Sequence, residues 1–563
     1  MVGRRRLISL LLGALVPGRS SHAQNLSHLG TLTPFYRSTQ LQGHLIGMGL
    51  VEIPEYLLGQ DVDLRYRRNP ALREEIPFVD SFTINRFLGG YREDWLKKYR
   101  LWNEELGERS LDYVIKGNTG SLEFRPELIR ERLAPYLEAG YRPKDITLAL
   151  ENIPWDLADG RRGPHHEGPW GQEEPPRNMR QWTAVISHFA EDLKAYLGSA
   201  ATDVGFETGV EYDERVSFDA SADEFYQYYA ATYEGLHAVL PNASLSPGEF
   251  TGLGTCKPGE TECVYDTQAF IEFARAHQLR VSCVPRSLHS LFDSPNPYPS
   301  AAVRRAEISY ARIPGTIAEI HQFGLLGQPF GDNSGSDPGA AQANWQFQAL
   351  IGLWQRVKPR RVFHWGGFSS VGKLPFLNGA GFLRLVLDRY LGSQAILLPI
   401  EETNRSTAAP HTELMAVGLS APTLSAVIIS SFSAVKSNAG KEVRVRLPQN
   451  LFKGNTAGLK VLRYRASDNV FSAIRAHLAA GNNLKAEFAS NPSCVADPLG
   501  MAKDQGNARS MLYKNWPEYV AIMKMDLKWR TNDRETSIDG QLILRARLEA
   551  NELLVAEVDS RRP

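Results

Sequence analysis

The feature of this sequence that most restricts its fold is a regular alternation of short apolar runs and amphipathic helical segments between about residues 80 and 366. Each apolar run has the length of a buried strand, and the segments between the runs repeat apolar residues at helical spacing. We count eight such runs, and eight parallel strands joined by helices close into a (β/α)8 barrel. The sequence therefore predicts an α/β fold built on a TIM barrel. The predicted strands are residues 82–88, 111–117, 146–155, 204–210, 245–250, 280–291, 315–326 and 361–367.

The stretch from Val204 to Arg215 and its continuation show this pattern most fully. The stretch begins as an apolar run and ends in a cluster of acidic residues. Ser221 and Glu224 then fit a capping box, in which each side chain accepts a free backbone N–H at the start of a helix. Apolar residues recur at helical spacing as far as Pro241, and the next apolar run follows. The segment therefore predicts a strand, a loop, a helix and a second strand.

The chain changes character beyond about residue 390. Short runs of strand-forming residues, separated by turn residues, replace the helical segments, and this favours a β-sandwich. These runs are residues 414–417, 424–431, 443–447, 459–464, 540–548 and 553–558. A chain of 563 residues needs more than one core. We therefore expect a barrel over residues 76–388, a C-terminal β-sandwich over residues 389–563, and an entry segment, residues 24–75, that adds strands to the sandwich.

The amino terminus has the pattern of a secretory signal peptide, residues 1–23. Arg4–Arg6 form a basic region, Leu7–Val16 form a short apolar region, and Ser21–Ala23 form a small-residue cleavage site. No apolar run is long enough to cross a bilayer. We therefore expect cleavage near Ala23, a secreted or periplasmic location, and no membrane span.

Charge and cysteine patterns exclude several classes of function. Lys plus Arg and Asp plus Glu both number 63, so no strong field favours nucleic acid as a partner. No Cys/His spacing suggests zinc, and we predict neither a metal nor a cofactor. Cys256 and Cys263 are close enough in sequence to close a local disulfide, whereas we interpret Cys283 and Cys494 as buried thiols.

Two polar segments suggest metal sites, but in each case a simpler interpretation is better. His165, His166 and Glu167 are neighbours in a Gly/Pro-rich excursion, residues 156–178, which we interpret as a solvated rim or lid. Residues 332–337 carry oxygen ligands but lack the full spacing of an EF-hand loop, so they predict a polar turn.

Candidate functional residues follow the predicted strands, because (β/α)8 enzymes carry their catalytic groups at the carboxyl ends of the strands. Glu211 follows the fourth predicted strand and is the principal candidate. Arg86 lies at the exit of the first strand, Asn152 and Trp155 at the exit of the third, and Glu249 at the exit of the fifth.

This arrangement resembles the (β/α)8 glycoside hydrolases of clan A, and most closely family 39, the β-xylosidase and α-L-iduronidase type. The family carries Trp-Glu-Val-Trp-Asn-Glu-Pro on its fourth strand, and Phe206–Tyr212 (Phe-Glu-Thr-Gly-Val-Glu-Tyr) occupies that register. On the seventh strand the family has Ile-Thr-Glu-Trp, where this chain has Ile320–Phe323 (Ile-His-Gln-Phe). His289 resembles the sixth-strand histidine, and Trp365 resembles the eighth-strand aromatic residue.

The resemblance implies a glycoside hydrolase that acts on a β-linked oligosaccharide or polysaccharide, with Glu211 as general acid/base. It places Gln322 at the nucleophile position, where a retaining enzyme needs a second carboxylate about 5–5.5 Å from the first. Val210 replaces the Asn that should hold the sugar 2-hydroxyl. The residues expected to contact substrate are Arg86, Asn152, Trp155, Glu207, Glu249, His289, His321 and Trp365.

The amide at Gln322 leaves three explanations open. The residue is an introduced substitution, or another acid serves as nucleophile or as the base of an inverting mechanism, or the barrel binds sugar without cleaving it. Glu249 and Glu151 at strand exits suit a second acid better than Glu319, whose side chain should face the other side of its strand.

Overall fold

The computed structural model describes residues 50–52, 59–62 and 79–559, with interruptions in the last range. The interruptions are residues 99, 162, 164–167, 169–170, 252–263, 292–295, 327–338, 366–368, 372–373, 391–392, 403–411, 422–423, 435–439, 450–458, 491–498, 532, 534 and 540–541. The chain divides into two compact units. The first comprises Tyr56–Leu326 and Arg356–Pro375, and the second comprises Met1–Glu55, Gly327–Gln355 and Phe376–Pro563.

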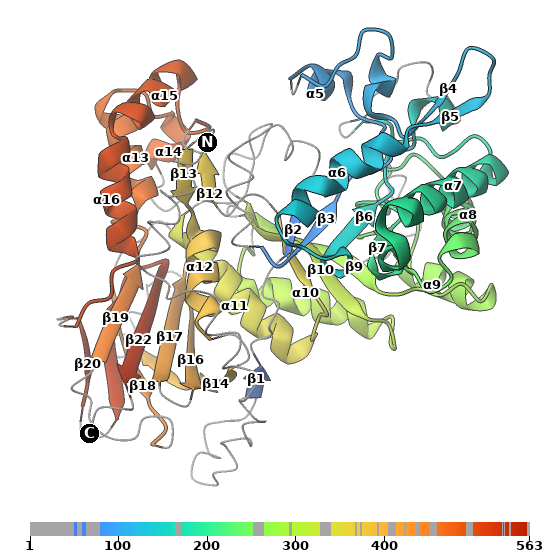
Figure 1. The fold of residues 1–563 in the computed structure, drawn as a ribbon. Helices are drawn as coiled ribbons and strands as arrows, with labels where there is room; N and C mark the ends of the chain where they lie inside the picture. The colour runs from blue at the N-terminus through green and yellow to red at the C-terminus, as the bar shows by residue number, and fades with distance from the viewer. Residues whose placement is uncertain are drawn as a thin grey trace. The chain divides into compact units, whose positions relative to one another are not determined.

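The first unit is a closed barrel of parallel strands (Figure 1). The strands are β2 (Gly59–Val62), β3 (Ser81–Ile84), β6 (Ile146–Ala149), β7 (Gly205–Glu207), β8 (Ser244–Ser246), β9 (Val284–Leu291), β10 (Ala318–Leu326) and β11 (Val362–His364). They pair in the order β8-β7-β6-β3-β2-β11-β10-β9. A parallel bridge between Phe250 and Arg286 joins the two ends of this sheet. The order follows the chain once around the barrel, so the predicted (β/α)8 fold is confirmed.

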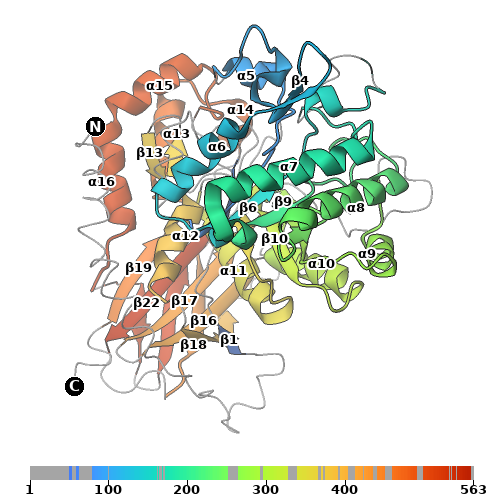
Figure 2. The same cartoon turned by 45° about the vertical axis from the view of Figure 1, so that its right-hand side comes forward.

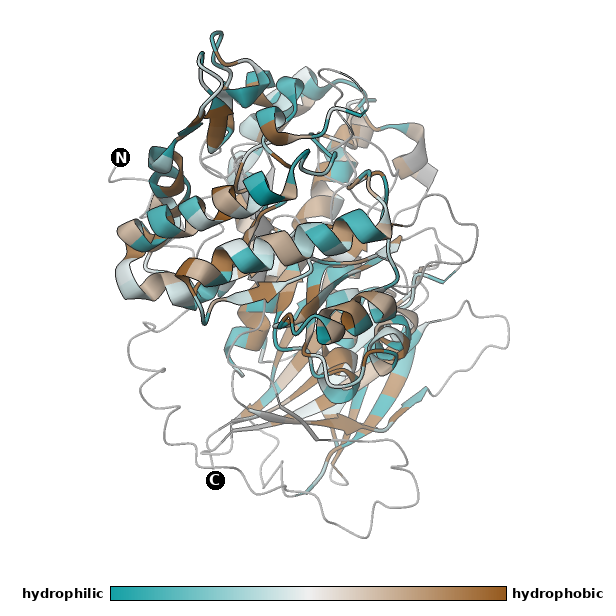
Figure 3. Ribbon diagram, turned by 90° about the vertical axis from the view of Figure 1, so that its right-hand side faces the viewer, coloured by the Kyte–Doolittle hydropathy of each residue, from teal (hydrophilic) through white to brown (hydrophobic). Residues whose placement is uncertain are grey.

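Helices alternate with these strands along the chain. Ser221 Oγ accepts from the Glu224 backbone N–H at 3.3 Å, and Glu224 Oε2 accepts from the Ser221 N–H at 2.8 Å, which confirms the predicted capping box of α8. Helices α7 and α8 lie side by side (Figures 1 and 2), and Trp182 Nε1 donates to Thr232 Oγ1 between them at 2.8 Å. Apolar and polar residues alternate along single helices in Figure 3, as expected for amphipathic elements. The helices of this unit are α5 (Glu93–Lys98), α6 (Pro126–Glu138), α7 (Met179–Leu197), α8 (Ala222–Val239), α9 (Thr267–Ala276) and α10 (Pro299–Ala311), with 3₁₀ turns η3 (Glu108–Leu111), η4 (Pro143–Asp145), η5 (Trp155–Leu157) and η6 (Gly198–Asp203).

One predicted barrel strand, residues 111–117, is wrong. Val114–Lys116 (β4) instead pairs antiparallel with Leu122–Phe124 (β5) in a separate two-stranded sheet. A tight turn joins the two strands, in which the Gly117 N–H donates to the Ser121 carbonyl at 2.9 Å. The strand that completes the barrel is β2, from the predicted entry segment. An apolar run does not reveal its pairing partner, because strand preference depends on neighbours that are distant in sequence.

The second unit contains the predicted β-sandwich. A six-stranded antiparallel sheet has the order β1-β14-β16-β17-β22-β19, and a four-stranded sheet has the order β15-β18-β21-β20. Val427 and Leu554 of the larger sheet share a buried core with Val445 and Leu544 of the smaller one, as two packed sheets require. The strands are β1 (Leu50–Glu52), β14 (Gln394–Leu398), β15 (Ile400–Glu402), β16 (Glu413–Ala421), β17 (Leu424–Phe432), β18 (Lys441–Arg446), β19 (Leu459–Tyr464), β20 (Thr536–Ile538), β21 (Ile543–Leu548) and β22 (Glu552–Asp559).

Helices also belong to the second unit, and those between β19 and β20 were not predicted. Asn469 caps the first of these by accepting from the Ser472 N–H at 3.0 Å, so a local helix signal was present in the sequence. The predicted boundaries at residues 76 and 388 stay predictions. The compact units group α11 (Ala340–Arg356) and α12 (Gly379–Asp388) with the sandwich. The remaining elements are α11 (Ala340–Arg356), β12 (Ser369–Val371), β13 (Leu374–Leu377), α12 (Gly379–Asp388), α13 (Val470–Ala480), α14 (Ala486–Ser490), α15 (Gln505–Lys514) and α16 (Trp516–Asp526). No helix in the described part of the chain is both long and apolar enough to cross a membrane.

A glycine allows the loops after β7 and β8 to approach closely. Gly248 has φ +87°, and a Cβ added there would lie 2.1 Å from the Gly209 carbonyl oxygen. We expect Gly248→Ala to lower the free energy of unfolding by about 2–5 kcal/mol, through backbone strain and overpacking together. The matched control is Gly315→Ala, at φ +82° with no described atom within 4 Å of the added Cβ, and it should lose about 1–2 kcal/mol from strain alone. Urea denaturation measures both variants, and equal losses would contradict the role of the contact.

Candidate active site

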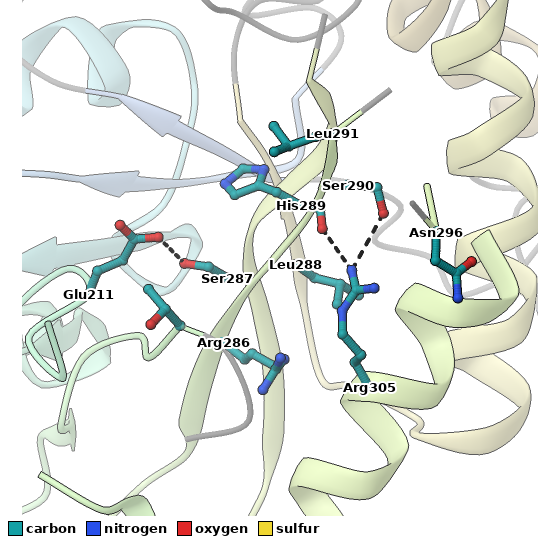
Figure 4. Close-up of a pocket in the computed structure, with 10 residues that line it drawn as sticks. Glu211, Arg286, Ser287, Leu288, His289, Ser290, Leu291, Asn296 and Arg305 are labelled. Carbon is teal, nitrogen blue, oxygen red and sulfur yellow. Dashed lines mark hydrogen bonds between the residues drawn. The ribbon is translucent and has the colours of Figure 1, made fainter. Parts of the chain in front are cut away.

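Glu211 lies at the edge of a cavity of about 370 Å³ in the barrel unit (Figure 4). It follows β7 in a loop, and its Oε1 accepts a hydrogen bond from Ser287 Oγ at 2.8 Å. Figure 4 shows these two side chains directed at each other. Strand β9 supplies most of the cavity wall, from Arg286 to Leu291, and Arg305 of α10 lies on the opposite side of that strand's end from Glu211.

The surroundings of Glu211 favour its protonated form. Burial raises the pKa of its carboxyl, and the negative charge of Glu214 raises it further, against the opposing hydrogen bond from Ser287. A general acid has to hold its proton near neutral pH, and enzymes achieve this for a glutamate through an apolar or acidic environment. Glu211 therefore has the environment that a general acid requires.

A second side chain of β9 reaches Gln322 on the neighbouring strand. His289 follows Ser287 by two residues and therefore faces the same side of the strand. Its Nε2 lies 3.2 Å from Gln322 Oε1, and the Trp365 ring packs edge-on with a centroid distance of 5.5 Å. Burial lowers the pKa of His289 to about 4, so the imidazole is neutral at pH 7. Ser287 and His289 thus lie on one face of β9, where Ser287 contacts Glu211 and His289 contacts Gln322.

Gln322 owes its orientation to an irregularity in β10. The pairing of β10 with β9 shifts register between His321 and Phe323, and Gln322 between them has φ 46°. A β-bulge of this kind redirects the side chain of the extra residue. Positive φ is rare outside glycine, and such strain concentrates at functional sites. The other predicted site residues with positive φ are Arg86, Asn152 and Glu211, each at 55°.

A group of predicted residues surrounds the ends of β3 and β6. The Arg86 backbone N–H donates to Glu151 Oε1 at 3.2 Å, and the Arg86 guanidinium lies 3.9 Å from the same oxygen. The Asn152 backbone N–H donates to the Tyr212 hydroxyl at 2.9 Å. Because Tyr212 directly follows Glu211, this bond connects the group to the loop that carries the candidate acid.

Of the predicted site residues, only Glu211 and His289 are among the described residues that line the cavity, so Trp155 and Glu249 lie outside its wall. Trp155 Nε1 donates to the Tyr91 carbonyl at 3.2 Å, and its backbone N–H donates to Asp112 at 2.7 Å. Glu249 is fully buried, and its N–H donates to the Gly209 carbonyl at 3.3 Å. Both residues therefore support the loops at the strand ends.

Glu207 and His321, predicted to contact substrate, instead form part of a buried charged cluster. His321 Nδ1 lies 3.3 Å from Glu207, its Nε2 lies 3.1 Å from Glu319, and Arg360 pairs with Glu319 at 2.7 Å. Burial disfavours a charged His321, but the two carboxylates outweigh it and raise the pKa to about 10. Burial likewise opposes ionisation of Glu319, but His321 and Arg360 lower its pKa to about 2. We refer to Glu207, His321, Glu319 and Arg360 as the buried ion cluster.

Asp213 is a carboxylate beside the site that sequence reasoning missed. Both of its oxygens accept from the Thr251 backbone N–H at 2.9 Å. Burial raises the pKa of Asp213 to about 7, and the nearby Glu211 and Glu214 add to the increase. Asp213 thus belongs to the electrostatic environment of Glu211.

Ser287 and Arg305 were also missed, for different reasons. Ser287 shares a strand face with His289, so the period of two along the predicted strand 280–291 was a usable signal. Arg305 comes from a helix and donates to the His289 carbonyl at 2.8 Å (Figure 4). Its place depends on how α10 packs on β9, which no local pattern encodes.

The structure tests the cysteine and metal predictions in part, because several of the residues concerned lie outside the described part of the chain. Cys283 is a free, buried thiol, as predicted, and lies 3.5 Å from Glu319 Oε2. Among the described residues, no group of three or more His, Cys, Asp or Glu side chains is arranged to hold a metal ion. The predictions that lie outside the described residues concern the signal peptide (residues 1–23), His165, His166, Glu167, Cys256, Cys263, Cys494 and the segment 332–337.

Comparison with known proteins identifies the fold. No protein-family model matches the chain, and none of the curated proteins matches it. A monomeric β-xylosidase from Caulobacter crescentus CB15 is 12% identical, with a TM-score of 0.56 over 90% of this chain and 97% of that chain. The GH39 enzyme from Xanthomonas axonopodis pv. citri is 13% identical, with a TM-score of 0.56 over 92% and 96%. A bacterial orthologue of human α-L-iduronidase is 11% identical, with a TM-score of 0.52 over 91% and 82%. The chain has the fold of these glycoside hydrolases, which confirms the predicted resemblance at the level of the fold.

Proposed function

We propose that this protein is an exported glycoside hydrolase that cleaves a β-linked oligosaccharide or polysaccharide, with Glu211 as general acid/base. The observation that carries the proposal is a carboxyl with a raised pKa that lines a cavity after the fourth barrel strand. Catalytic groups of (β/α)8 enzymes occupy this end of the strands. The solved β-xylosidase and GH39 enzyme have the same fold, which supports the choice of substrate class.

In the proposed reaction Glu211 first acts as an acid. Its carboxyl donates a proton to the glycosidic oxygen as the bond to the anomeric carbon breaks, and the resulting carboxylate later accepts a proton from water. Ser287 holds Oε1 of this carboxyl and thereby fixes its direction. The role requires the protonated form, and the burial of Glu211 supports that form.

The contacts proposed for the sugar differ from the predicted set. His289 lines the cavity, and the Trp365 ring beside it offers an apolar face on which a sugar ring can pack. We assign Arg86 and Asn152 to the same end of the barrel as Glu211, because the Asn152 N–H donates to the hydroxyl of Tyr212, the residue that follows Glu211. We assign Glu207, Glu249 and His321 a structural role because their side chains are buried.

The amide at Gln322 favours a second candidate, a catalytically inactive carbohydrate-binding protein on the same fold. An amide is a poor nucleophile, so the covalent intermediate of an ordinary retaining glycosidase would not form there. The pattern of residues 1–23 supports export in either case. A secreted or periplasmic location remains part of the proposal.

A paired binding and cleavage experiment tests the proposal. The full chain is screened on a glycan array, and each glycan that binds is incubated with protein in a reducing-sugar assay. Release of new reducing ends is the expected result. Binding without release contradicts the hydrolase and supports the inactive alternative; a gain of release by Gln322→Glu would then identify the amide as the reason.

A further inference from the structure

We propose that the nucleophile is supplied by the substrate, as a 2-acetamido group on the sugar whose anomeric carbon is attacked. The inference rests on the proposed function and names its substrate class. It follows from the carboxylates that the described residues of the site supply.

Glu211 is the one carboxylate among the described residues that line the cavity. Gln322 contacts His289, which lines the cavity, and the predicted family register places this amide where a retaining enzyme would carry its second acid. A glutamine there cannot form a glycosyl ester with the sugar.

The neighbouring carboxylates are engaged elsewhere. Glu151 is 2% exposed and pairs with Arg86, and Glu207 is 0% exposed and pairs with His321. Asp213 is 4% exposed, and both of its oxygens accept from the Thr251 backbone. Glu249 is also fully buried. Glu214 accepts from Thr251 Oγ1 at 2.6 Å, and none of these groups is among the described residues that line the cavity.

Among the described residues, this arrangement disfavours both common routes of glycoside hydrolysis. The retaining route needs a carboxylate nucleophile, and the inverting route needs a carboxylate base that activates water. The oxygen of an acetamide needs neither, because it attacks as a neutral nucleophile already attached to the sugar. One acid in the site is then sufficient.

The neutral pair of Gln322 and His289 suits an acetamido group. An amide side chain both accepts and donates hydrogen bonds, so Gln322 can accept the acetamido N–H and orient its oxygen. His289 contacts Gln322 at 3.2 Å, and the Trp365 ring beside it offers an apolar surface for the acetamido methyl. The cavity volume of about 370 Å³ suits a small ligand such as one substituted sugar ring.

The reaction balances without an enzyme nucleophile. The acetamido oxygen forms a bond to the anomeric carbon while the bond to the leaving group breaks, and Glu211 transfers its proton to the departing oxygen. The products are an alcohol and a bicyclic oxazolinium, whose positive charge is matched by the Glu211 carboxylate. Water then adds to the anomeric carbon as the ring opens, and its proton returns to Glu211.

The test compares two series of 4-methylumbelliferyl β-glycosides with the full chain, each in the gluco and galacto configurations. One series carries a 2-acetamido group and its mono-, di- and trifluorinated forms, and the other carries a 2-hydroxyl. We expect cleavage of the acetamido series, with kcat/KM falling at least about tenfold on full fluorination, because fluorine withdraws electrons from the attacking oxygen. Gln322→Leu, which keeps similar bulk without hydrogen bonds, should also lower kcat/KM for the acetamido glycoside by at least about tenfold at an unchanged Tm.

The outcomes separate this inference from the proposed function. Cleavage of the 2-hydroxyl series at equal or higher kcat/KM, or no fall on fluorination, overturns the inference and leaves the hydrolase intact. Absence of cleavage in both series and in every glycan of the screening panel overturns the proposed function as well.

Discussion

Replacement of Glu211 by Gln is expected to reduce kcat/KM for an unactivated β-linked oligosaccharide by about 10²–10⁴-fold, the usual contribution of general acid–base catalysis. Glutamine keeps the shape of the side chain but has no proton to give to the leaving oxygen. Binding of the same oligosaccharide, measured by calorimetry, should change little because the cavity is unaltered. For aryl glycosides with acidic leaving groups, kcat/KM should fall less, because the departure of such a leaving group needs little protonation.

The matched control is Glu214→Gln in the same loop. Glu214 Oε1 accepts from Thr251 Oγ1 at 2.6 Å, and it does not belong to the described cavity wall. This variant removes the same charge close to Glu211 but leaves the proposed acid in place, so it should remain active. A Glu211→Gln protein that hydrolyses at the wild-type rate would remove Glu211 from the mechanism.

Ser287→Ala probes the same carboxyl without removing it. The lost hydrogen bond stabilised the ionised form of Glu211, so the pKa of Glu211 should rise further. A general acid is active when protonated, and the alkaline limb of the kcat/KM profile should therefore move to higher pH. Movement of that limb to lower pH would contradict the assigned role.

Replacement of His321 by Gln is expected to lower the free energy of unfolding by about 3–5 kcal/mol, the usual cost of removing one partner from a buried ion pair. The substitution leaves the carboxylate of Glu207, which is 0% exposed, without its cation. The control is Arg356→Ala, which breaks an exposed pair with Glu307 at 3.6 Å and should cost about 0–1 kcal/mol. Denaturant titration measures the free energy of unfolding of both variants. Equal losses would show that the buried ion cluster stabilises the fold no more than the exposed pair does.

The pH dependence of this loss follows from the directions of the two pKa changes. The pKa of His321 is raised to about 10, so its stabilising effect is complete below its ordinary value of 6.5 and is lost as pH rises toward 10. The pKa of Glu319 is lowered to about 2, so its effect is complete above 4.5 and is lost as pH falls toward 2. The difference between wild type and His321→Gln should therefore be largest between about pH 4.5 and 6.5. A difference that grows from pH 7 to pH 10 would contradict the assignment.

Much of the candidate site was visible in the sequence because strand ends can be located from local patterns. Glu211 was found as the first acid positioned after a buried run and before a capped helix. His289 and Gln322 were found through a family register, and the structure joins them by a contact of 3.2 Å. His321 and Glu207 were predicted to contact substrate, and the structure places both side chains in the buried ion cluster.

The sequence by itself determined the kinds of elements and their order. Helix α8 begins at its capping box, and strand β17 carries the apolar residues that the sandwich buries, because periodicity and caps depend on residues a few positions apart. The tertiary structure alone decided that β2 rather than residues 111–117 completes the barrel, that β10 bulges at Gln322, and that Ser287 meets Glu211. Those outcomes depend on contacts between residues separated by tens to hundreds of positions, and the free energy of such contacts has no signature in any local stretch of the chain.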